Sequence, residues 1–126
     1  MLRKLSLAAL CATTLLSNVV FSATENVFPQ STHYDFILPA HEPQIFSNAF
    51  MWTVDSKCTI ITDVESTPFS LKVLRKSGSL NGVKLSKGDS MDVIVHPGDK
   101  LHITAASGGR VELTNNGEET IKARCE

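Results

Sequence analysis

Residues 87–125 read KGDSMDVIVHPGDKLHITAASGGRVELTNNGEETIKARC, and apolar and polar side chains alternate along most of this stretch. Such alternation is typical of β-strands that have one face in a core and the other in solvent. Four runs carry their apolar residues in phase: Met91, Val93 and Val95; Leu101, Ile103 and Ala105; Val111 and Leu113; Ile121, Ala123 and Cys125. The connections between these runs, at 96–98, 107–109 and 115–117, are rich in residues that turn chains. This part of the sequence therefore predicts a regular meander of short antiparallel strands.

An internal echo lies within the same stretch. Gly88–Val93 is followed ten residues later by Gly98–Ile103, and each copy reads Gly-Asp followed by alternating polar and apolar residues. Glycine supplies an unusual backbone dihedral and the aspartate accepts hydrogen bonds from nearby backbone N–H groups, so the pattern is typical of strand starts. It places Asp92 and His102 on outward faces, with His96 in the turn between them. If the two strands pair as a hairpin, Asp92 and His102 are cross-strand neighbours, and all three side chains are candidates for an interaction site.

The same alternation extends upstream through four further runs: Tyr34, Phe36 and Leu38; Phe50, Trp52 and Val54; Cys58 and Ile60; Phe69, Leu71 and Val73. Pro39 and Pro43 exclude a regular central strand between the first two runs. Asn81 and Gly82 suit a tight hairpin turn that requires positive φ. We therefore expect an all-β fold, a small antiparallel β-sandwich of about 7 to 9 strands, immunoglobulin-like or jelly-roll-like, with one disulfide.

The N-terminus has the pattern of a secretory signal peptide. Arg3 and Lys4 precede an apolar run over residues 5–21 that ends in small residues. Polar residues interrupt this run, and it is shorter than the roughly 20 apolar residues that a membrane-spanning helix needs. Cleavage is favoured after Ser22, with Ala23 as the alternative. We expect a signal peptide over 1–22, a flexible arm over 23–31 and a sandwich domain over 32–126. The mature chain is expected in the periplasm or outside the cell, without an integral membrane segment.

Two cysteines remain after cleavage, Cys58 and Cys125, and an exported chain favours a disulfide between them. Both are in phase with inward-facing residues, so we expect a bridge that crosses the core. The bridge closes a loop of about 68 residues, which in the chain-entropy model contributes about 4 kcal/mol of stability. Two unpaired thiols or an intermolecular bridge are the alternatives.

Charge and motifs exclude several function classes. The mature chain has 10 basic and 13 acidic side chains, which does not favour nucleic acid or an anionic membrane surface as a partner. It contains no G-x-S-x-G elbow, no H-E-x-x-H pair and no phosphate-binding glycine loop. We therefore predict no enzymatic activity, no cofactor and no metal. A secreted metal-binding or metal-dependent domain stays open as an alternative, if Asp92, His96 and His102 converge with a further acid or histidine.

The stretch IFSNAFMWTV, residues 45–54, contains the only tryptophan of the protein. Because Phe50, Trp52 and Val54 share a strand face, we expect them to fill the core of a domain that has few aromatic residues. Met51 lies on the opposite face and is therefore the better contact candidate.

A second contact candidate is basic. Arg75 and Lys76, together with Lys72, predict a solvated edge that discourages pairing between sheets. The alternative is that these residues meet an acidic partner.

The segments HYDFILPAHEPQIFSNAFMWTVDSKCTI and KVLRKSGSLNGVKLSKGDSMDVIVHPGDKLHITAASGGRVELTNNGEETIKARC together cover nearly all of the mature chain. In both, the chain resembles the small exported enhanced-entry protein B family of intracellular bacterial pathogens. The resemblance implies an envelope or secreted protein associated with host-cell entry, without known catalysis, and it assigns no site residues. The function expected from the sequence is therefore a non-enzymatic binding module with an unidentified protein partner. A structural envelope component that pairs through an edge strand is a further alternative.

Overall fold

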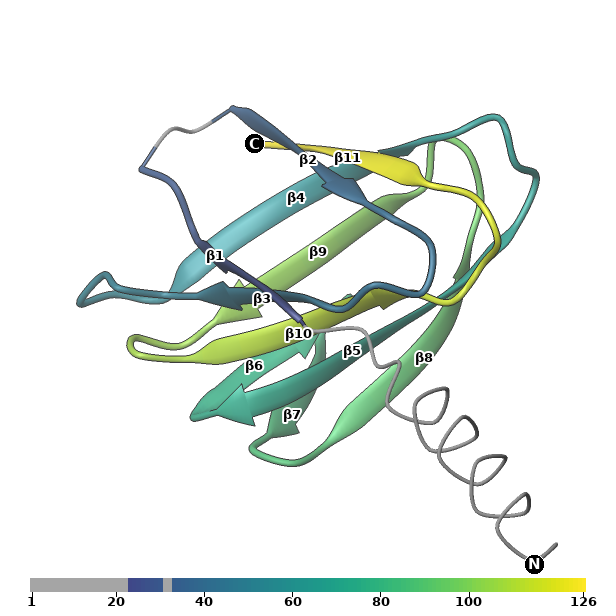
Figure 1. Ribbon diagram of the computed structural model, residues 1–126. Helices are drawn as coiled ribbons and strands as arrows, with labels where there is room; N and C mark the ends of the chain where they lie inside the picture. Colours follow the sequence, from purple (N-terminus) through teal and green to yellow (C-terminus); the bar gives the residue numbers. More distant parts are fainter. Residues whose placement is uncertain (1–22, 31–32) are drawn as a thin grey trace, which may run out of the picture.

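The computed structural model describes residues 23–30 and 33–126, so the predicted signal peptide over 1–22 lies outside the described residues. Within this part the chain folds into eleven strands, which pack as two facing sheets (Figure 1). The strands are β1 Thr24–Val27, β2 Tyr34–Leu38, β3 Gln44–Ser47, β4 Val54–Ile61, β5 Thr67–Arg75, β6 Ser77–Leu80, β7 Val83–Ser86, β8 Ser90–Val95, β9 Lys100–Ala105, β10 Arg110–Asn115 and β11 Ile121–Cys125. The predicted all-β sandwich is confirmed. Among the described residues, no helix has the length and apolar character needed to cross a bilayer.

The connectivity of the two sheets is that of a jelly roll. Their strand orders are β1-β3-β10-β5-β8 and β2-β11-β4-β9-β6-β7. When β3 to β10 are counted as strands one to eight, one sheet runs 1-8-3-6 and the other runs 2-7-4-5. β1 extends the first sheet, and β2 and β11 extend the second. Of the two sandwich types expected, the topology therefore matches the jelly roll.

The predicted meander over residues 87–125 is wrong. β8 and β10 belong to the five-stranded sheet, whereas β9 and β11 belong to the six-stranded sheet. Each connection in this part of the chain therefore crosses from one sheet to the other. The error has a simple cause: alternation reports that a strand is buried on one face, and this holds equally for a hairpin neighbour and for a strand in the facing sheet.

The strand count exceeds the predicted 7 to 9 because two short strands carry no alternating signal. Residues 24–27, expected within a flexible arm, form β1, which runs parallel to β3. Phe28 follows β1 and is 5% exposed, packed against Phe46 with ring centroids 5.5 Å apart. β3 begins directly after Pro43 and lies between β1 and β10. A proline directly before a strand does not prevent the strand itself from pairing. The expectation that no regular central strand forms here is therefore also wrong.

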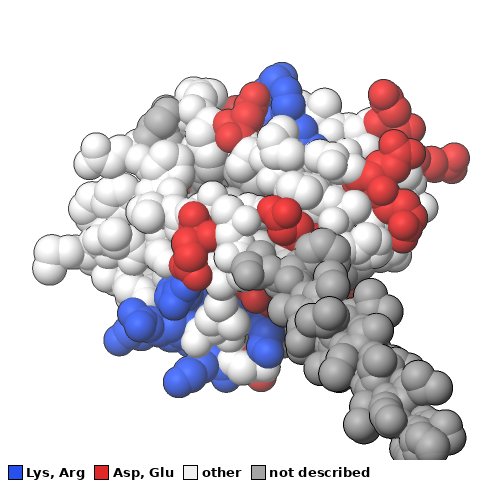
Figure 2. Space-filling view, in the orientation of Figure 1, with Lys and Arg blue, Asp and Glu red and all other residues white. Residues whose placement is uncertain are grey.

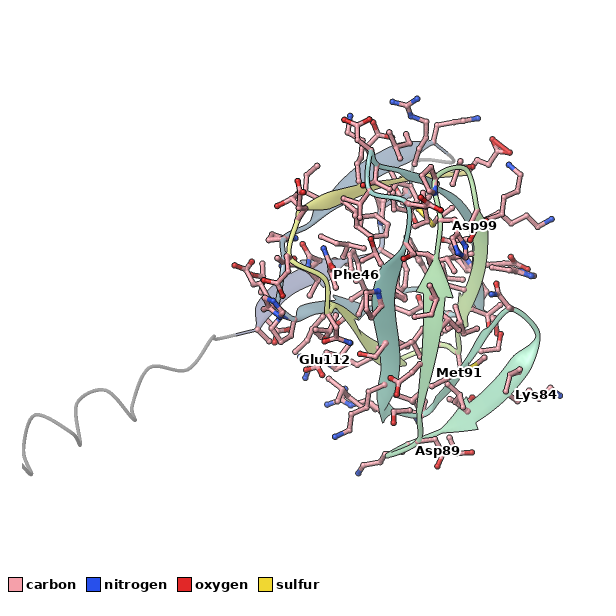
Figure 3. All side chains as sticks on the ribbon, turned by 90° about the vertical axis from the view of Figure 1, so that its right-hand side faces the viewer. Phe46, Lys84, Asp89, Met91, Asp99 and Glu112 are labelled. Carbon is pink, nitrogen blue, oxygen red and sulfur yellow. A yellow bond between two sulfur atoms is a disulfide. The ribbon has the colours of Figure 1, made fainter. Side chains whose placement is uncertain are left out.

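Most of the core between the sheets comes from the inward faces that the alternation predicted. Phe69, Leu71 and Val73 of β5 are at most 1% exposed. Phe46, which is labelled in Figure 3, belongs to the same buried cluster. The predicted hairpin is also confirmed, since β6 and β7 are joined by Asn81 and Gly82 with φ of 51° and 86°.

The disulfide between Cys58 and Cys125 is present, but it does not cross the core. The two residues lie directly opposite each other on β4 and β11, neighbouring strands of the six-stranded sheet. Both side chains are buried, as predicted from their phase. The bridge therefore fastens the last strand to the middle of its own sheet.

Candidate functional site

The loop over residues 48–53, which joins β3 to β4, is fastened to the sandwich by one buried side chain (Figure 1). We call it the aromatic loop. Asn48 is 2% exposed, and its Nδ2 donates to the backbone oxygen of Trp52 at 2.8 Å. The same nitrogen lies 2.9 Å and 3.1 Å from the carbonyl oxygens of Ala105 and Ala106, while Oδ1 accepts from the N–H of Phe50 at 2.8 Å. The backbone of the loop is therefore held in one conformation by a residue that solvent does not reach.

The same loop exposes two large apolar side chains. Met51 is 91% exposed and Trp52 is 60% exposed, and the Trp52 ring stacks on Phe50 with centroids 4.8 Å apart. The prediction that Phe50, Trp52 and Val54 share an inward strand face is therefore wrong, because residues 48–53 form a loop and β4 begins only at Val54. The exposure of Met51, expected from the sequence, is confirmed.

A hollow of about 410 Å³ lies beside the loop, which we call the Trp52 hollow. Its lining residues are Pro29, Gln30, Tyr34, Phe50, Trp52, Thr53, Val54, Asp55, Ser56 and Glu126. The hydroxyls of Tyr34 and Ser56 are 2.6 Å apart, and burial raises the pKa of the Tyr34 phenol above its usual 10.0. The wall of the hollow therefore combines aromatic surface with a neutral hydroxyl pair and two carboxylates, which suits a ligand with both apolar and polar groups.

The three members of the predicted histidine and aspartate site do not converge. Asp92 lies on β8 of one sheet, whereas His102 lies on β9 of the other, so the expected cross-strand pair does not exist. His102 instead contacts Asp55 of β4, with Nε2 and Oδ1 2.5 Å apart. No group of three or more His, Cys, Asp or Glu side chains within the described residues is arranged to hold a metal ion.

His96 belongs to a local turn, as the turn interpretation of the sequence predicted. Asp99 Oδ2 accepts from the His96 backbone N–H at 2.8 Å and lies 3.0 Å from its Nδ1. The backbone hydrogen bond, followed by the ring, lowers the pKa of the Asp99 carboxyl below its usual 3.8. Asp89 makes the matching contact in the first copy of the echo, accepting from the Ser86 N–H at 2.9 Å. Both aspartates therefore stabilise the turns before their strands.

The Asp99 turn predicts a specific loss of stability in acid. A carboxyl whose pKa is lowered by folding stabilises the folded state above its unfolded pKa, and this contribution is lost as pH falls through the folded pKa. We therefore expect Asp99→Asn to melt at a lower temperature than wild type near pH 7, with the difference disappearing between roughly pH 4 and pH 2. Thermal unfolding followed by circular dichroism measures this. Asp92→Asn is the matched control and should leave the melting temperature unchanged, since the Asp92 side chain is exposed and makes no hydrogen bond with a described residue. A difference for Asp99→Asn that persists undiminished in acid would contradict the assignment.

Charge is divided between the two ends of the sandwich. The loops 39–43, 62–66, 96–99 and 116–120 meet at one end and contain no Lys or Arg. Their acidic residues are Glu42, Asp63, Glu65, Asp99, Glu118 and Glu119. Acidic side chains gather at the right of the view, while Lys and Arg gather at the lower left, where β5, β6 and β7 lie (Figure 2). The aromatic loop projects from the end opposite the acidic loops.

Arg75 and Lys76 are exposed at the turn between β5 and β6, where Lys76 has a φ of 61°. Lys72 is also exposed, but β5 lies between β10 and β8 and is not an edge strand. The predicted role of these residues in protecting a sheet edge is therefore wrong. Their exposure leaves them available for a partner.

Sequence reasoning missed the two residues that organise the loops. Asn48 fastens the aromatic loop, and Asn115, which is fully buried, fastens the opposite end. Asn115 Nδ2 donates to the backbone oxygens of Leu38 and Glu119 at 2.9 Å and 2.8 Å, and its Oδ1 accepts from the Gly117 N–H at 2.8 Å. Asparagine at or just after the end of a strand is an ordinary turn signal, and nothing in the sequence marks these two side chains as buried.

Comparisons of the chain with family models, curated proteins and solved structures find no match. The resemblance to the enhanced-entry protein B family therefore stays a prediction.

Proposed function

We propose that this protein is an exported, disulfide-bonded module that binds a protein partner through the aromatic loop. One observation carries the proposal: Met51 and Trp52 are exposed on a loop whose backbone is fixed by buried Asn48. An apolar pair that serves only stability would lie in the core, where its burial is favourable. Side chains that are both exposed and held in place are instead characteristic of recognition.

The rigidity of the loop favours binding in a quantitative way. Ordering a rotamer-rich side chain at an interface costs about 0.5–1.5 kcal/mol, and a flexible loop adds the cost of ordering its backbone. Asn48 removes much of the backbone cost in advance. The stacking of Trp52 on Phe50 restricts the indole as well. Tryptophan is among the residues most enriched at interface hot spots, so Trp52 is the anchor and Met51 an adaptable neighbour.

Export is part of the proposal. A disulfide persists in oxidising compartments, and the N-terminal sequence has signal-peptide features. The resemblance to the enhanced-entry protein B family adds an association with the bacterial envelope and host-cell entry. Intact-mass measurement of the exported protein under non-reducing conditions tests this part. A chain that begins after Ser22 and carries one disulfide is expected, whereas a chain retaining residues 1–22 would contradict it.

The binding surface is tested with Trp52→Ala. We expect the affinity for a partner captured from envelope or host-cell extracts to fall at least about tenfold, since truncation of a hot spot costs about 2 kcal/mol or more. Because Trp52 is the only tryptophan, its fluorescence reports directly on the complex and should shift to shorter wavelength on binding.

Val83→Ala is the matched control, because Val83 is an exposed apolar side chain, 46% accessible, on β7. It should bind the same partner as tightly as wild type does. Equal affinity of wild type and Trp52→Ala for every saturable partner would contradict the proposal.

A further inference from the structure

β8 is the longest of the four edge strands, and it lacks the lysines, prolines and bulges that can protect an edge. The edge strands of the two sheets are β1, β8, β2 and β7, and β8 is the longest of them, with six residues against four, five and four. Its sequence, SMDVIV, contains no lysine, arginine or proline, and its pairing with β5 has no bulge. Natural sheets use charged side chains, above all lysine, together with proline and bulges to prevent pairing at an exposed edge. The open side of β8 is therefore competent to accept another strand.

The register identifies the backbone groups that face the open side. The Pro68 carbonyl accepts from the Asn116 N–H at 2.9 Å, so Pro68 faces β10, and the next residue, Phe69, faces β8 opposite Val93. The N–H and C=O groups of successive residues point to alternate sides of a strand. Met91, Val93 and Val95 therefore bond to β5, whereas Ser90, Asp92 and Ile94 direct their N–H and C=O groups to the open edge.

Two hollows that share lining residues lie near the C-terminal half of β8, and only the first of them is lined by residues of β8. The first, about 400 Å³, is lined by Pro68, Phe69, Asp92, Val93, Ile94 and Asn116. The second, about 330 Å³, shares Pro68 and Asn116 with the first and adds the carboxylates of Glu118 and Glu119. Ile94 is 55% exposed at the rim of the first hollow. Both hollows thus combine apolar surface with acids, and no lysine or arginine lines either of them.

The charges around β8 select the kind of strand that fits. Asp92 is exposed and forms no ion pair with another described residue. The nearest cation by register, Lys72, lies opposite Ser90 on one side and opposite Glu112 on the other. A second copy of this chain fits poorly in the register centred on Asp92, because that antiparallel pair sets the two Asp92 carboxylates opposite each other. A strand with lysine or arginine opposite Asp92 is instead electrostatically complementary.

We propose that the open edge of β8 binds an extended, basic segment of a partner protein, which adds to the five-stranded sheet as a sixth strand. The backbone groups of Ser90, Asp92 and Ile94 supply the hydrogen bonds. The first hollow takes an apolar side chain against Ile94, and the carboxylate of Asp92 attracts a basic side chain. This mode of recognition combines main-chain affinity with side-chain selectivity. β8 is the edge of the five-stranded sheet away from β3, the strand before the aromatic loop, so this proposal does not depend on the loop.

Hydrogen exchange with two synthetic peptides tests the proposal. The probe is a peptide of about ten residues in which lysine alternates with valine or threonine, long enough to span a strand. The comparison peptide carries glutamate in place of each lysine. We expect the basic peptide to slow exchange at the Ser90, Asp92 and Ile94 amides about tenfold or more, and the acidic peptide to have no such effect.

Two variants separate backbone from side-chain contributions. Ile94→Pro removes an N–H that faces the open edge and should weaken the basic peptide at least about tenfold, whereas Ile94→Thr keeps the N–H and should weaken it only about two- to threefold. Asp92→Lys leaves the backbone intact and should also lose at least tenfold, which keeps the test decisive if Ile94→Pro fails to fold.

Three outcomes overturn the proposal. The first is equal binding of the basic peptide to wild type and Asp92→Lys. The second is protection at β1, β2 or β7 in place of β8. The third is protection of the three β8 amides that rises with protein concentration in the absence of peptide, since that would assign the edge to a second copy of this chain.

Discussion

Replacement of Cys58 and Cys125 together by alanine is expected to lower the free energy of unfolding by about 4 kcal/mol. The two residues are separated by 67 positions, and closing a loop of this length removes a large amount of conformational freedom from the unfolded chain. The bridge also ties β11, the last strand, to β4 in the six-stranded sheet. β11 carries β2 on its other side, so two strands depend on its attachment. Small domains are stable by only about 5–15 kcal/mol, so a loss of this size leaves the fold marginal.

Urea unfolding of the double variant measures this effect, and reduced wild type provides the control. Reduction keeps both sulfur atoms in place, so agreement between the two samples assigns the loss to the crosslink and not to the smaller side chains. A loss below about 1 kcal/mol in both samples would show that the strands are held by packing and hydrogen bonds alone. A larger loss in the alanine variant than in reduced wild type would measure the cavity left by the buried sulfur atoms.

Asn48→Ala is expected to cost about 2–4 kcal/mol of stability and to release the aromatic loop. The amide lies within hydrogen-bond distance of four backbone groups, and a buried partner left unsatisfied costs about 1–3 kcal/mol. Without the amide, the backbone bonds of residue 48 to Gly108 and Gly109 remain at the start of the loop. Further along the loop, the Ser107 hydroxyl still donates to the Phe50 carbonyl at 2.7 Å, but the Trp52 carbonyl loses its bond to the amide. Partner binding is therefore expected to weaken together with stability.

Asn115→Ala separates these two effects, because Asn115 is the equivalent buried anchor of the opposite end. We expect a similar stability loss from Asn115→Ala but unchanged affinity of the aromatic loop for its partner. The fluorescence of Trp52 provides a second readout, since it should become more accessible to a soluble quencher in Asn48→Ala but not in Asn115→Ala. Equal loss of partner affinity in both variants would show that Asn48 acts through general stability and not through the loop.

Much of the fold follows from local pattern. Leu38, Ile60 and Leu71 are buried where the alternation expects them, and Asn81 and Gly82 form the expected hairpin turn. These predictions succeed because the period of two and the need for positive φ are properties of adjacent residues. β1 was not predicted, because its strand conformation depends on a distant partner and not on a local pattern. Its residues, TENV, have no apolar alternation, and only the presence of β3 beside them makes a strand.

The candidate site depended on information of another kind. Phe50, Trp52 and Val54 alternate as a strand does, but the Asn48 side chain turns the backbone away from the core before β4 begins. Asp92 and His102 are only ten positions apart in the chain, yet they lie in different sheets. The local sequence predicts neither the loop conformation nor the assignment of these strands to different sheets, because both depend on contacts with residues far along the chain.

The sequence by itself determined which face of most strands is buried, where most turns lie and which two cysteines pair. Those features rest on backbone geometry between neighbouring residues and on the small number of cysteines. Only the tertiary structure decided which sheet each strand joins, which edge stays open and which aromatic residues reach solvent. The physical reason is that a half-buried strand has the same alternation in either sheet, so its partners are selected by the packing of the whole sandwich. The exposed Trp52 and the open edge of β8 are consequences of that packing.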